Sequence, residues 1–290
     1  MTRSPDRLAP QKGLLRPRGN GERFTAIPRV FSRIPMKRLA QLSVLLGLTG
    51  TALFSDAGTV KPKVDDALTP LPPASVKFTG WLSQQLSTCR EGRMLQQSIP
   101  DLVLPFKARN ETRFWQTEFW GKWFTSAALS WRNDGDSAQK ARLDEAVSEL
   151  LKTQTLDGYI GNYQPDAQTK QWDIWGRKYV MLGLIAYYDL TGDAKALTGA
   201  IREADYTINQ LKSLNLNIVT CGNWTGMAAS SILEPIVLLY RRTGEGRFLA
   251  FAEDIVEKWQ TPPGPDLLRK ALAGTAVYDM FPGPDPAQKG

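Results

Sequence analysis

Apolar residues recur with a helical period along much of the chain. One such set is Leu143, Ala146, Val147 and Leu150. Their spacings of three and four residues place them on one face of a helix. Residues 180–188 are apolar on nearly all sides, as expected for a helix packed between neighbours. No segment alternates between apolar and polar residues over the length of a strand, so the pattern predicts an all-α protein.

Three segments of the chain match one another: LSWRNDGD (129–136), YYDLTGD (187–193) and LLYRRTGE (238–245). Each ends in a glycine and then an acid, with an aromatic residue four positions before the glycine. A glycine at this position ends a helix in the left-handed conformation, and the acid after it caps the next helix. A repeat of about this length is typical of stacked αα-hairpins.

The connections between the hairpins have an unusual composition. Because each glycine turn closes one end of a hairpin, the connections must lie at the opposite end of the array. They are residues 108–120, 157–179 and 214–227. All three are rich in Trp, Asn and polar groups, and the last two also in Gly. The sequence therefore predicts a cleft lined by these loops on one face of the array.

The chemistry of these loops suits a carbohydrate. Aromatic rings stack on the apolar faces of a sugar, while amides and carboxylates bond its hydroxyl groups. The candidate substrate-binding residues are Glu118, Trp120, Asp157, Tyr159, Asn162, Tyr163, Trp172, Trp175, Lys178, Asn223 and Trp224, with Trp115 and Asp173 beside them.

Simpler interpretations compete for some of these residues. Glu118 and Asp173 each precede a basic residue by four positions, Lys122 and Arg177, so both pairs could be ordinary surface ion pairs. Trp123 has the spacing of a core residue. No acid stands out as a catalytic residue, so the catalytic residues are left unassigned.

The net charge of +7 lies entirely in residues 1–57, and the remaining residues are balanced, which argues against a nucleic-acid partner. Residues 36–57 have the basic start, apolar run and small-residue end of a secretory signal peptide. We expect residues 1–35 to be disordered or an over-extended start, and 58–75 to be a linker. The domain would then occupy 76–290 of a secreted or periplasmic protein with no stable membrane span after cleavage.

The chain contains no histidine and two cysteines, Cys89 and Cys221. The lack of histidine excludes a Ser-His-Asp triad and histidine-ligated zinc within this chain. The two cysteines could pair in an oxidising compartment, but their spacing gives no metal signature. We expect no metal ligands and no cofactor in this chain.

Four longer motifs carry a family resemblance: WQTEFWGKWFTSAALSWR, LLKTQTLDGYIGNY, WDIWGRKYVMLGLIAYYDLTGD and GMAASSILEPIVLLYRRTG. Together they resemble the N-terminal part of the catalytic domain of glycoside hydrolase family 127, the β-L-arabinofuranosidase-like proteins, over residues 78–259. The resemblance implies an (α/α)6 toroid. It also implies retaining hydrolysis of arabinose-containing glycans by a cysteine nucleophile in a zinc-thiolate site, with a glutamate acid/base.

The family's catalytic residues lie in the later half of its toroid and have no counterparts here. Neither cysteine stands in the family's metal motif. The resemblance therefore suggests an incomplete toroid, inactive alone, whose partner would be a missing C-terminal half and in which only a complete member would hold zinc. In half a ring, the apolar residues of the last hairpin would be uncovered; they are Ile232, Ile236, Leu239 and Phe248.

Two other functions stay open at this point. An unsaturated-uronyl hydrolase could use a similar toroid, with Asp157 or Asp173 as its free acid. A non-catalytic module or remnant could bind glycan without turnover.

Overall fold

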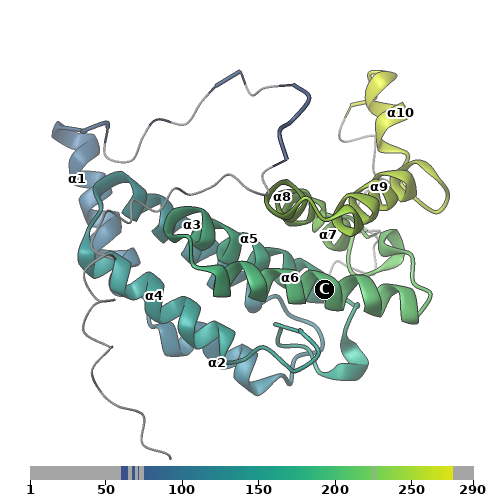
Figure 1. The fold of residues 1–290 in the computed structure, drawn as a ribbon, viewed down its shortest axis with the longest axis horizontal. Helices are drawn as coiled ribbons and strands as arrows, with labels where there is room; N and C mark the ends of the chain where they lie inside the picture. The colour runs from purple at the N-terminus through teal and green to yellow at the C-terminus, as the bar shows by residue number, and fades with distance from the viewer. Residues whose placement is uncertain (1–59, 65–66, 69–70, 72–74, 225, 277–290) are drawn as a thin grey trace, which may run out of the picture. The chain divides into compact units, whose positions relative to one another are not determined.

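The computed structural model describes residues 60–64, 67–68, 71, 75–224 and 226–276 (Figure 1). The expected disordered start at 1–35 and the expected signal peptide at 36–57 lie outside these residues. The chain divides into two units, Met1–Phe54 and Ser55–Gly290, and everything described below belongs to the second. No helix in the described residues is both long and apolar enough to cross a membrane.

The described residues form an all-α structure, as predicted, with only an isolated bridge between Glu111 and Tyr163 in place of strands. The α-helices are α1 (Gly80–Cys89), α2 (Ile99–Ala108), α3 (Thr117–Asp134), α4 (Ser137–Leu151), α5 (Asp173–Thr191), α6 (Ala194–Ser213), α7 (Met227–Ser230), α8 (Leu233–Thr243), α9 (Gly246–Gln260) and α10 (Leu267–Leu272). Shorter π-helical or 3-10 turns are Arg90–Met94, Pro165–Ala167 and Ile218–Thr220.

The predicted hairpin turns are present. Gly135, Gly192 and Gly244 end α3, α5 and α8 with φ of 72°, 72° and 70°, the left-handed conformation that glycine adopts without strain. Asp136 then caps α4 through its carboxylate, which accepts from the Gln139 backbone N–H at 2.8 Å. Three hairpins result, namely α3–α4, α5–α6 and α8–α9.

The first helices of the three hairpins run parallel. At their N-terminal ends, Lys178 of α5 lies 3.6 Å from Glu234 of α8. At their C-terminal ends, Arg242 of α8 forms an ion pair with Asp189 of α5. Helices α3 and α5 also pack together along their length, and Figure 1 shows α3, α5 and α6 side by side. Repeated hairpins with parallel first helices are the unit of an (α/α)6 toroid, and the described residues form part of one.

Glycine lets α3 and α5 approach closely. A Cβ at Gly121 of α3 would collide with the backbone of Tyr179 on α5, and one at Gly176 of α5 would collide with the Thr117 hydroxyl on α3. Because these contacts pair the first two turns of both helices, the loops before α3 and α5 meet at one end. The turns at Gly135 and Gly192 lie at the other end, so the predicted alternation is observed.

The prediction that the last hairpin is uncovered is wrong. All four of its apolar residues are fully buried: Ile232, Ile236, Leu239 and Phe248. The physical reason is that α8 lies against both α5 and α9, which close over its apolar face without a further hairpin. A short helix, α10, follows Asp266.

Candidate glycan-binding surface

A continuous run of aromatic rings lies where the N-terminal ends of α3 and α5 meet. We call these five residues the aromatic surface: Phe114, Trp115, Trp172, Trp175 and Tyr179. Each ring contacts the next edge to face, with centroid distances of 6.0, 5.8, 5.8 and 5.1 Å in that order. Phe114 and Trp115 are 48% and 42% exposed, so solvent reaches the outer part of the run. The exposed face of an individual ring offers the flat apolar contact that a sugar needs.

A buried carboxylate lies beneath this surface. Glu118, in the first turn of α3, accepts a hydrogen bond from the Trp175 indole N–H and another from the Lys122 ammonium at 2.8 Å. It is 7% exposed, so the expected Glu118–Lys122 pair exists but is not a simple surface pair. The carboxylate fixes the orientation of the Trp175 ring.

Two ammonium groups lie over the inner rings. The Lys122 Nζ is 5.9 Å from the centroid of Trp175 and 5.1 Å from that of Tyr179, and the Lys178 Nζ is 5.0 and 5.1 Å from the same centroids. These are cation–π distances. The amines therefore occupy part of the inner rings and leave Trp115 and Trp172 as the freer contact area.

The predicted substrate-binding residues divide into groups. Glu118, Trp172, Trp175 and Lys178 belong to the aromatic surface or touch it. Asn223 is beside it, since its backbone N–H donates to Gln171, the residue before Trp172, at 3.1 Å. Asp157 and Trp224 are exposed, and no ring contact joins Trp224 to the run.

The remaining predicted residues lie inside the protein. These are Trp120, Tyr159, Asn162 and Tyr163, each 2% exposed or less. Trp120 stacks on Phe124 in the core at 4.7 Å. In this structure Trp120 packs in the core and the other three support the loops, so these four offer almost no surface to a ligand. Trp123 is also a core residue, as expected.

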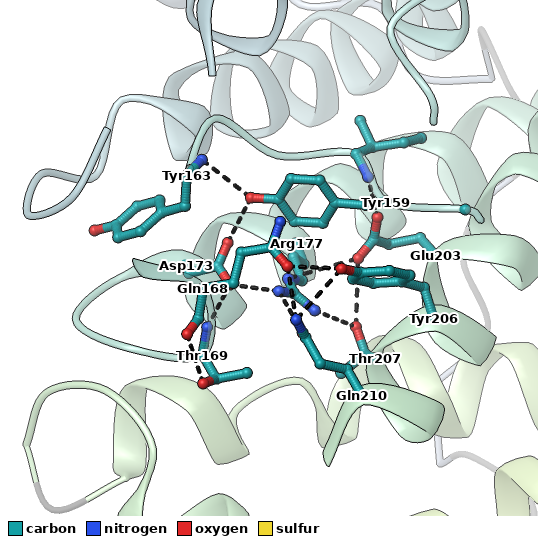
Figure 2. Close-up of polar contacts among 12 residues, drawn as sticks. Tyr159, Tyr163, Gln168, Thr169, Asp173, Arg177, Glu203, Tyr206, Thr207 and Gln210 are labelled. Carbon is teal, nitrogen blue, oxygen red and sulfur yellow. Dashed lines mark hydrogen bonds and ion pairs between the residues drawn. The ribbon is translucent and has the colours of Figure 1, made fainter. Parts of the chain in front are cut away.

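The interpretation of Asp173 and Arg177 as a surface pair is wrong, because both are buried. Asp173 accepts from the Tyr159 hydroxyl at 2.7 Å, from the Thr169 backbone N–H at 2.8 Å, and from Arg177. Figure 2 shows Arg177 at the centre of this network, with α6 supplying Glu203 on its other side. The network joins the 157–173 connection to α5 and α6.

Glu203 is a buried residue that the sequence interpretation missed. Burial raises its pKa to about 8, although Arg177 and the Ile160 backbone N–H partly offset this effect. The sequence pattern could have identified Glu203 as buried, because it falls on the same helical face as the buried residues Ala196 and Ala200. A charged residue at such a position is seldom buried without partners.

The described residues do not fit a zinc-thiolate site. They contain no group of three or more His, Cys, Asp or Glu side chains placed to hold a metal. Cys89 and Cys221 are free thiols, one exposed and one buried, so they do not form a disulfide. Burial raises the pKa of the Cys221 thiol to about 11, which disfavours the thiolate that metal binding requires.

Stacked αα-hairpins with parallel first helices define an all-α protein of the (α/α)6 toroid class. The family profile described as "Beta-L-arabinofuranosidase, GH127 catalytic domain" matches residues 68–278. The chain belongs to this family of glycoside hydrolases.

Solved structures resemble the chain over a limited part of their own length. One, described as a glycoside hydrolase, is 16% identical with a TM-score of 0.45, over 64% of this chain and 26% of that chain. Another, a GH127 β-L-arabinofuranosidase from Geobacillus stearothermophilus T6, is 17% identical with a TM-score of 0.42, over 67% of this chain and 32% of that chain. Comparison with curated proteins gives no match to the sequence.

Proposed function

We propose that this chain binds arabinose-containing glycans through the aromatic surface and so serves the substrate-binding part of a β-L-arabinofuranosidase-like glycoside hydrolase. Family membership supports the carbohydrate class. The observation that carries the proposal is the edge-to-face contact of Trp115 and Trp172 at 5.8 Å, next to the buried Glu118 carboxylate. A sugar ring can stack on such indoles while nearby polar groups bond its hydroxyls.

Binding can be tested by titrating the purified chain with an arabinofuranosyl oligosaccharide in a calorimeter. We expect the wild type to bind and Trp115→Ala to weaken binding about tenfold or more, since burying the apolar surface of a large side chain contributes about 1.5–3 kcal/mol. Trp81→Ala is the matched control, because Trp81 is an exposed indole on α1, 71% exposed, with no ring contact among the described residues. Equal affinity of both variants and the wild type would contradict the proposal.

Turnover separates this proposal from an active-enzyme alternative. We expect the chain alone to release no arabinose from an aryl arabinofuranoside, with or without added zinc. Zinc-dependent release, lost in both Cys89→Ser and Cys221→Ser, would instead assign catalysis to this chain.

We also propose that the protein is exported. The basic and apolar layout of residues 36–57 supports this. N-terminal sequencing of exported protein should give a start near Gly58. Mature protein that begins before Met36 would contradict the proposal.

A further inference from the structure

The hydroxyl of Tyr163 connects the two backbone segments that carry the aromatic surface. It accepts a hydrogen bond from the Trp172 backbone N–H at 3.2 Å and donates one to the Phe114 carbonyl at 3.0 Å. The Tyr163 side chain itself is buried, with 1% of the residue exposed. One phenol therefore spans the gap between the loop before α3 and Trp172, the N-cap residue of α5.

The position of this phenol is itself fixed. The Tyr163 backbone N–H donates to the Tyr159 hydroxyl at 3.0 Å, and that hydroxyl donates to Asp173 at 2.7 Å. Two further backbone bonds join the same loops, because the Glu111 N–H donates to Asn162 at 3.0 Å and the Gln164 N–H donates to Glu111 at 3.1 Å. The Tyr163 ring thus has little freedom to shift.

We propose that Tyr163 is a positioning residue for the aromatic surface, which sets the spacing between the Phe114 and Trp172 backbones and thereby the contact between Trp115 and Trp172. The expected effect of Tyr163 on glycan binding rests on the proposed function. Tyr163 does not touch a ligand in this assignment, since its side chain is buried.

The chemistry of the phenol suits this role. Burial raises the pKa of Tyr163 well above its usual value, so the hydroxyl keeps its proton and its donor to Phe114 over the ordinary pH range. The Trp172 N–H stands at the N-terminus of α5, where backbone donors lack partners within the helix. Removing the hydroxyl leaves this donor and the Phe114 carbonyl without their shared partner.

The test is Tyr163→Phe, with Tyr187→Phe as the matched control. Tyr187 is also a buried phenol, 6% exposed, and it lies on a part of α5 away from the aromatic surface. Its hydroxyl donates to Asp144 of α4 at 2.5 Å. Each variant is examined by circular dichroism of the coupled indoles, by thermal unfolding, and by titration with an arabinofuranosyl oligosaccharide. The unfolding data show whether the two variants lose comparable stability.

We expect Tyr163→Phe to reduce the coupled-indole signal and to weaken sugar binding about fivefold. Tyr187→Phe should leave both unchanged. An unchanged indole signal in Tyr163→Phe overturns the inference, whatever its affinity. If the wild type binds no sugar but Tyr163→Phe still alters the indole signal, the positioning role is upheld and the proposed function is overturned.

Discussion

Arg177 of α5 and Glu203 of α6 lie side by side in the protein interior, with 3.7 Å between Nε and Oε1 and no exposed side-chain surface on either. Arg177 is already paired with Asp173. A second ionised carboxylate would therefore leave an uncompensated negative charge in a buried site. Burial is the main reason why Glu203 favours its neutral form, and the nearby Asp173 charge adds to the effect. The network is therefore sensitive to both mutation and pH.

Replacing Arg177 should strongly destabilise the fold. Arg177→Met removes the cation that pairs with both Asp173 and Glu203, so we expect the free energy of unfolding to fall by about 3–5 kcal/mol. Urea unfolding measures the change. The control is Arg242→Met, which breaks a partly exposed pair with Asp189 and should cost about 1 kcal/mol or less. Equal losses of unfolding free energy in the two variants would show that the buried ion pairs of Arg177 stabilise the fold no more than the partly exposed pair does.

Stability should decrease as the pH rises from about 4.5 to about 8. The pKa of Glu203 is raised from 4.5 to about 8 in the folded protein, so the folded state binds more protons than the unfolded state in this window. Ionisation of Glu203 in the folded protein should lower the free energy of unfolding by an amount on the order of a few kcal/mol between these two pH values. Denaturant unfolding at several pH values measures the slope.

The matched variants for this pH dependence are Glu203→Gln and Glu253→Gln. Glu203→Gln removes the titrating group, so much of the slope should disappear. Glu253 is exposed on α9, and its replacement should leave the slope as in the wild type. A slope that survives Glu203→Gln unchanged would assign the effect to another group.

The hairpins were predictable because their signals are local. A glycine that needs a positive φ, followed by a capping acid, identifies a helix–helix turn wherever it occurs, as at Gly135 and Gly192. The end of the array that carries the aromatic loops followed from those turns alone. These features do not depend on knowing which residues meet across the core.

Burial within the loops could not be predicted in the same way. The composition of the connection predicts the same surface role for Tyr159, Tyr163 and Trp172. The first two are nevertheless buried, because their hydroxyls form hydrogen bonds with Asp173 and with backbone groups. Whether a polar group is satisfied depends on long-range contacts, here between residues up to 49 positions apart. The same reasoning explains why Glu203, whose partners lie on other elements, was missed.

The two thiols should differ in reactivity. Cys89 is exposed, whereas Cys221 is 2% exposed and burial raises its pKa to about 11. Because the thiolate is the reactive form, an aromatic disulfide reagent should modify one thiol in the native protein at about pH 8 and two after denaturation. Cys89→Ser should abolish the native reaction, and rapid modification of that variant would contradict the structure.

The close approach of α3 and α5 should tolerate no added methyl group at Gly121. A Cβ there would overlap the backbone and Cβ of Tyr179, which cannot move aside as a flexible side chain could. We therefore expect Gly121→Ala to lower the free energy of unfolding by about 1–3 kcal/mol, although alanine favours helix.

Gly246→Ala is the control, since Gly246 begins α9 with open space around its Cβ position and its replacement should change stability little or increase it. Because Tyr179 carries one ring of the aromatic surface, Gly121→Ala should also weaken binding of an arabinofuranosyl oligosaccharide in the calorimeter. Equal stability of the two alanine variants would contradict the packing described between α3 and α5.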